Sequence, residues 1–170
     1  MEENEMKRII IYYSLTDNTK NAAESLAKLL DADVCRIETV KPMPSDKDKQ
    51  MIIGGMKAVF GMCPEIKGVP SEILSYDEII VGTPIWAGKN APAVNTLLKN
   101  KKIREKVTAV FTLSGGGDND KCMARLRKML PNLKHTAALA DRNHKTACCN
   151  EDKLCALAEE MCRCSRHSSK

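Results

Sequence analysis

The sequence is poor in aromatic residues, which make up 4% of its 170 positions and include a single tryptophan. Proteins that bind single-stranded nucleic acid stack bases on aromatic side chains, and the net charge here is only a mild +5 spread along the chain. Long apolar runs are also missing, because the longest, around residues 9–13, has the length of one strand. We therefore expect neither a dedicated nucleic-acid-binding protein nor a protein that crosses a membrane.

Eight cysteines are present, but no two of them have the C-x₂-C spacing that is typical of zinc sites. Five gather near the C-terminus, where Cys148 and Cys149 are adjacent. Cys155 and Cys162 fall beside the apolar face of an expected helix, where a free thiol behaves as a small hydrophobe. Disulfide frameworks belong to short secreted chains, and the acidic start of this chain differs from the basic start of a secretory signal. We expect free thiols, no metal site and a cytoplasmic location.

Segments with strand and helix periodicity alternate along the chain, which is typical of βαβ units and a parallel sheet. Strands are expected at residues 7–13, 32–38, 78–82, 107–113 and 136–140. Helices are expected at residues 19–30, 46–60, 91–99, 119–130 and 152–163, and irregular structure at 61–75 and from Gly82 to Asn90. No change in composition marks a linker, so one domain is expected over residues 1–170, with a core at 6–163 and a polar tail at 164–170.

Short polar side chains connect the first expected strand to the first expected helix, in the order Ser14-Leu15-Thr16-Asp17-Asn18-Thr19. The free N–H groups at the start of a helix and the positive end of its dipole attract a phosphate, and hydroxyl groups can add further donors. The same composition is also typical of an ordinary helix cap, made here by Asn18 or Thr19. This loop alone leaves both interpretations open.

The tryptophan lies in a second connection, Gly82-Thr83-Pro84-Ile85-Trp86-Ala87-Gly88-Lys89-Asn90. A large aromatic side chain between a strand and a helix, outside any periodic apolar face, favours stacking on a planar ligand, and Gly88 would let the backbone approach a ring. The alternative is that Trp86 fills a small hydrophobic cluster. A third loop, Ser114-Gly115-Gly116-Gly117-Asp118, either exposes N–H groups to polar ring edges or is simply a flexible turn.

The loops that follow the strands of an open parallel sheet meet at one crevice. These three loops, in this order and spacing, resemble the flavodoxin family over the chain as far as about Arg163. The resemblance implies a three-layer α/β fold with a doubly wound, five-stranded parallel sheet in the order 2-1-3-4-5. It also implies FMN bound non-covalently across the loops and used to move electrons, so no catalytic side chain is expected.

The resemblance assigns a role to each loop by position. It places the FMN phosphate on Ser14, Thr16, Asn18 and Thr19, with backbone contact from Leu15. It places one side of the flavin ring against Pro84, Ile85, Trp86, Ala87 and Gly88, and the other edge against Ser114, Gly115, Gly116, Gly117 and Asp118. We further expect Lys89 to lie near enough to the ring to stabilise its reduced form.

Two features depart from the family pattern. Asp17 stands where the family has a small residue, most often glycine, so its carboxylate must either point to solvent or repel the phosphate. The chain is also basic, whereas flavodoxins that carry electrons are typically acidic, so we expect its partners to differ from theirs.

The expected function is an FMN-binding redox protein that exchanges electrons with a partner protein or a small acceptor. The sequence does not separate a carrier from a small NAD(P)H-dependent FMN reductase or quinone reductase. A third alternative is a flavodoxin-like interaction module that has lost its cofactor because of Asp17. A homodimer also stays open.

Overall fold

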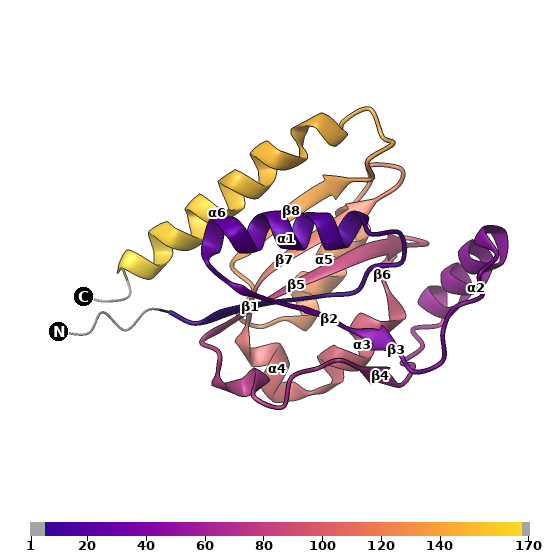
Figure 1. Cartoon of the computed structure of the whole chain (residues 1–170), viewed down its shortest axis with the longest axis horizontal. Helices are drawn as coiled ribbons and strands as arrows, with labels where there is room; N and C mark the ends of the chain where they lie inside the picture. The colour runs from indigo at the N-terminus through magenta and orange to yellow at the C-terminus, as the bar shows by residue number, and fades with distance from the viewer. Residues whose placement is uncertain (1–5, 168–170) are drawn as a thin grey trace.

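Five parallel strands form the centre of the protein, whose computed structural model describes residues 6–167 (Figure 1). In order across the sheet, these strands are β2 (Asp33–Arg36), β1 (Arg8–Tyr12), β5 (Glu78–Trp86), β7 (Val107–Ser114) and β8 (His135–Ala140). In chain order of the parallel strands this is 2-1-3-4-5, so the expected topology is confirmed. The order in which the chain adds strands reverses between β1 and β5, and doubly wound folds bind their ligands at this position.

Helices cover both faces of the sheet. On one face, α1 (Asn18–Leu30) and α6 (Asn150–His167) pack on a core centred on Ile10 and Phe111. On the other, α3 (Pro92–Lys99), α4 (Lys101–Lys106) and α5 (Asp120–Met129) pack on a core centred on Ile9 and Ile11. Successive strand residues thus serve opposite faces, which is why β1 reads as an unbroken apolar run.

The remaining helix, α2 (Lys47–Val59), stands at one end of the molecule, away from the two layers (Figure 1). Its bounds agree with the helix expected at residues 46–60. It contacts the rest of the protein through β5, α3 and the short strand β6 (Lys89–Asn90). This position puts α2 beside the ends of the central strands.

The expectation of irregular structure from Gly82 to Asn90 is wrong. Strand β5 continues to Trp86, and β6 pairs back on it antiparallel to close a hairpin. Its two turn residues, Ala87 and Gly88, both have positive φ, 48° and 74°, as a two-residue type I′ turn requires.

Smaller differences lie at the edges of the fold. β3 (Glu38–Thr39) and β4 (Ile66–Lys67) form a two-stranded ribbon, and single turns of 3₁₀ helix occur at η1 (Ile73–Ser75) and η2 (Ala147–Cys149). Helix α6 continues to His167, beyond the expected end at residue 163, and residues 168–170 of the expected tail lie outside the described residues. None of the helices in the described part of the chain has the length and apolar character needed to cross a bilayer.

Candidate functional site

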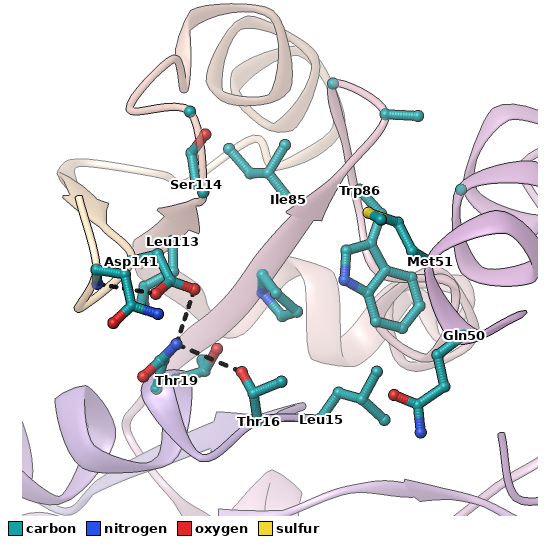
Figure 2. Close-up of a pocket in the computed structure, with 18 of the residues that line it drawn as sticks. Leu15, Thr16, Thr19, Gln50, Met51, Ile85, Trp86, Leu113, Ser114 and Asp141 are labelled. Atoms are coloured by element: carbon teal, nitrogen blue, oxygen red, sulfur yellow. Dashed lines mark hydrogen bonds between the residues drawn. The ribbon is translucent and has the colours of Figure 1, made fainter. Parts of the chain in front are cut away.

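A cavity of about 860 Å³ lies at the carboxyl ends of the central strands. Its walls are the loops that follow β1, β5, β7 and β8, together with one side of α2 (Figure 2). The volume is within the range of cavities that enclose small-molecule ligands and cofactors. All the site residues expected from the sequence line it except Ser14 and Gly117.

Backbone donors at the start of α1 are free at this cavity. Among the described residues, none accepts a hydrogen bond from the backbone N–H groups of residues 16–19. The N-cap is Asp17, and its side chain makes no capping hydrogen bond, so the interpretation of Asn18 or Thr19 as an ordinary cap is wrong. Four unpaired donors at the positive end of a helix dipole favour an anion.

Side chains on either side of these donors fix the loop in place. Ser14 is buried beneath the loop rather than on the cavity wall, and its hydroxyl accepts from Lys20 N at 3.4 Å. Asn18 donates to the Asp141 carboxylate at 2.8 Å, which ties the loop after β1 to the loop after β8 (Figure 2). Thr16 lies on the cavity wall itself, and its hydroxyl accepts from the Asn18 side-chain amide at 3.4 Å.

Asp17 adopts a left-handed conformation, with φ 61°, which explains why a glycine would suit this position. Its carboxylate lies 3.6 Å from the guanidinium of Arg36, and its side chain is 60% exposed. Arg36 also donates to the carbonyl oxygen of Ser14 at 2.8 Å. The carboxylate is therefore paired with a cation on β2 and is absent from the cavity wall.

Trp86 packs against a hydrophobic cluster and also lies on the cavity wall. The indole and the Tyr13 ring form a T-shaped pair, with centroids 5.6 Å apart and planes at 85°, and a Cβ on Gly54 of α2 would lie 3.1 Å from Cε3 of the indole. The side chain also lines the cavity (Figure 2). Burial raises the pKa of the Tyr13 hydroxyl, with Arg36 opposing the shift, so this neighbour of Trp86 stays neutral at physiological pH.

A buried polar network holds the hairpin that carries Trp86. The side chain of Asn90 is fully buried, donates to Asn95 Oδ1 at 2.9 Å and accepts from Arg125 at 2.8 Å. Nearby, the hydroxyl of Thr83 accepts from Ala91 N at 3.0 Å. Because each buried group has a partner, the network rigidifies the hairpin relative to α3 and α5.

The third loop meets the cavity with Ser114, Gly115, Gly116 and Asp118. Gly117 does not, because it lies against His144, whose Cε1 would be 2.9 Å from a Cβ at this position. The expectation that Lys89 lies near a bound ring finds no support in its contacts, since its ammonium group donates to the Val59 carbonyl at the end of α2, 2.6 Å away.

Several wall residues were not expected from the sequence. From α2 these are Lys47, Asp48, Gln50, Met51 and Gly55, and from other elements they are Leu113, Asp141 and Asn143. Asp141 directly follows β8, so the rule that singled out the other loops would have found it. The contribution of α2 depends on how the helix is placed in space, which no local pattern reveals.

Cys35, Cys63, Cys122, Cys155 and Cys162 are free thiols, and so are Cys148 and Cys149, whose Sγ atoms lie 3.8 Å apart. Within the described part of the chain, no three His, Cys, Asp or Glu side chains come together as a metal site would require.

A doubly wound sheet in this order, with unpaired N–H groups and an aromatic wall at its switch point, defines the class of flavodoxin-like proteins. The flavodoxin family model matches residues 7–151, and the chain belongs to this family, which confirms the expected membership. No curated protein matches the sequence.

Solved structures share the fold. A flavoprotein from Lactobacillus acidophilus NCFM, crystallised in complex with FMN, is 25% identical, with a TM-score of 0.66 over 79% of this chain and 92% of its own. A protein from Bacteroides eggerthii DSM 20697 is 25% identical, with a TM-score of 0.68 over 89% and 98%. A Fusobacterium nucleatum flavodoxin bound to flavin mononucleotide is 15% identical, with a TM-score of 0.55 over 93% and 98%, and shows the fold alone.

Proposed function

We propose that this flavodoxin-family protein binds one FMN non-covalently in the cavity and transfers electrons through it. One observation carries the proposal: the unpaired N–H groups that start α1 and the side chain of Trp86 face the same cavity. A phosphate at one end and a flat apolar ring at the other are what distinguish FMN from simpler anions. A flavoprotein of the same fold was crystallised with FMN.

The cavity residues fit the parts of this cofactor. The N–H groups of residues 16–19 and the hydroxyl of Thr16 would hold the phosphate. Leu15, Met51 and Trp86 would exclude water from the ring, and Gly115 and Gly116 leave backbone donors accessible to its polar edge. When bound, FMN supplies one- and two-electron chemistry, while the protein supplies position and electrostatics.

The pairing of Asp17 with Arg36 weighs against the alternative of an interaction module that has lost its cofactor. That alternative depended on a carboxylate repelling the phosphate. A neighbouring guanidinium offsets the negative charge, and the side chain does not reach the cavity wall.

The electron partner is a protein or a small acceptor, and the site of action is the cytoplasm. The free thiols of Cys35, Cys63, Cys122, Cys148, Cys149, Cys155 and Cys162 support this location. Reduction of the bound flavin by NADPH alone would make the protein a reductase, whereas inertness towards NADPH would make it a carrier.

Titration of the cofactor-free protein with FMN and with riboflavin tests the proposal, because riboflavin lacks only the phosphate. Two charge-assisted hydrogen bonds at the start of α1 should make FMN about a hundredfold tighter. FMN, but not riboflavin, should stay with the protein through a desalting column. Equal affinity for the two flavins, or binding of neither, would contradict the proposal.

A further inference from the structure

The outward side of α2 is apolar, which is unusual for a surface helix. Ile52 is 63% exposed, Phe60 at the end of the helix is 75% exposed, and Met56 and Val59 lie on the same side about half exposed. Met56, Val59 and Phe60 follow Ile52 by four, seven and eight residues, and this helical spacing places the four side chains in one stripe. We call these four residues the α2 patch. Exposed apolar patches of this kind mark interaction surfaces.

The α2 patch is continuous with the mouth of the cavity. Met51, the neighbour of Ile52 on the same helix, is 74% exposed and also lines the cavity beside Trp86 (Figure 2). A protein seated on the patch would therefore lie next to any cofactor in the cavity. Electron transfer needs a short distance between donor and acceptor, and a protein docked on the α2 patch would meet this requirement.

Positive charge is in excess along the segment that carries the patch. Residues 41–62 contain four lysines and two aspartates, and one of those carboxylates, that of Asp46, is engaged in capping α2 through Lys49 N at 2.9 Å. Lys41 and Lys49 are exposed, and Lys89 adds a further cation where α2 ends at Val59. An apolar surface in a segment with an excess of lysines is complementary to a partner surface with an apolar centre and acidic surroundings.

The charge around the patch favours an acidic partner protein over a second copy of the chain. A second copy of the chain would bring two sets of lysines together around one apolar contact, and like charges across an interface cost several kcal/mol. An acidic partner instead gains attraction from the same lysines. The basic character of the whole chain, +5, favours the same choice.

We propose that the α2 patch is the docking site for an acidic one-electron carrier protein, and this inference rests on the proposed FMN function. In the docked complex, the carrier gives one electron to the bound cofactor or accepts one from it. One protein is thus oxidised by the same single electron that reduces the other. The apolar patch supplies contact area, and the lysines supply fast, salt-sensitive encounter.

The test measures binding of an acidic plant-type [2Fe–2S] ferredoxin to the cofactor-free protein by titration calorimetry. It also measures the rate of electron exchange between that ferredoxin and the FMN-loaded protein by stopped flow. Lys41→Glu combined with Lys49→Glu should weaken binding and slow exchange by about tenfold. Ile52→Gln combined with Phe60→Gln should have a similar effect, because these side chains are exposed and absent from the cavity wall.

Matched controls separate docking from general charge. Lys28→Glu combined with Lys102→Glu changes the net charge equally on exposed positions of α1 and α4, and should leave both measurements within about twofold. Leu29→Gln is the control for loss of an exposed apolar side chain. Equal losses in the control and patch variants would overturn the proposal, as would ferredoxin binding that is insensitive to salt.

Two further outcomes distinguish docking of a carrier protein from dimerisation and from the proposed FMN function. Dimers that Phe60→Gln dissociates, together with unchanged ferredoxin binding in the patch variants, would assign the patch to a second copy and overturn the proposal. The FMN titration and reduction of a neutral quinone test the proposed function separately, because neither requires the patch. Intact FMN binding with patch-independent ferredoxin exchange would therefore refute the docking site alone.

Discussion

Helices α1 and α2 have thirteen residues each and border the same cavity, but they are built in opposite ways. Helix α1 buries its apolar face, with Ala23 and Leu26 inaccessible to solvent, and the backbone N–H groups of residues 16–19 at its start are unpaired. Helix α2 exposes its apolar face and closes its own N-terminus with the side chain of Asp46. Helix α1 therefore leaves polar backbone groups unpaired, whereas α2 leaves apolar side chains exposed.

This reversal indicates what each helix is missing. A buried apolar face makes α1 part of the folded core, and its unpaired donors need an anion. A capped N-terminus removes that requirement from α2, whose exposed apolar face needs a partner surface instead. In the functions proposed above, α1 would hold the cofactor phosphate and α2 would receive a docking protein.

Helices α1 and α2 should differ most in how much their apolar side chains contribute to the free energy of unfolding. Leu26→Ala in α1 should lower the free energy of unfolding by about 3 kcal/mol, because it leaves a cavity in the core beneath the sheet. Ile52→Ala in α2 should change it by less than about 0.5 kcal/mol, since that side chain is already largely exposed. Urea denaturation of both variants measures the difference. Similar losses would mean that α2 is packed more closely than its exposure indicates.

A second prediction concerns the donors at the start of α1. Thr16→Val removes one hydroxyl from the cavity wall and should weaken FMN binding by about tenfold, the effect of a single hydrogen bond to a charged group. Riboflavin binding should change much less, because it has no phosphate. Thr39→Val, which removes a hydroxyl from β3 outside the cavity lining, is the matched control. Quenching of flavin fluorescence gives both affinities.

A third prediction uses two adjacent glycines of α2. A Cβ on Gly55 would meet nothing within 4 Å, so Gly55→Ala should raise the free energy of unfolding by about 0.5–1 kcal/mol through helix propensity. A Cβ on Gly54 would lie 3.1 Å from the Trp86 ring, so Gly54→Ala should gain less and displace the indole. The emission of the only tryptophan should shift in Gly54→Ala alone. Identical behaviour of both variants would show that α2 does not rest on Trp86.

The core of α1 could be predicted from the sequence, whereas the roles of α2 could not. The apolar run from Ile9 to Ile11 and the helical spacing of Ala23, Leu26 and Leu30 are local signals, so the central strands and α1 were correctly expected. The hairpin at Trp86 was missed because Pro84 lies within β5 and its turn is Ala87-Gly88 rather than the usual Asn-Gly.

Contacts between residues that are distant in the sequence could not be predicted from the sequence either. Two interpretations of Asp17 remained because its pairing with Arg36 joins residues from different elements. Similarly, nothing in the apolar pattern of α2 says which side faces the cavity, so Met51 was not expected on the wall. Both features depend on tertiary structure, which periodicity does not describe.

The smallest expected effect separates the two ends of α1. Asp17 and Asp31 flank this helix, and both have positive φ, 61° and 49°. Replacing either by glycine should relieve backbone strain and raise the free energy of unfolding by about 0.5 kcal/mol. Only Asp17→Gly also removes a negative charge beside the phosphate donors and releases Arg36, so it alone should tighten FMN binding, by about threefold. If both variants bound FMN as the unchanged protein does, Arg36 would already neutralise Asp17 fully, and the charge at this position would be irrelevant to the cofactor.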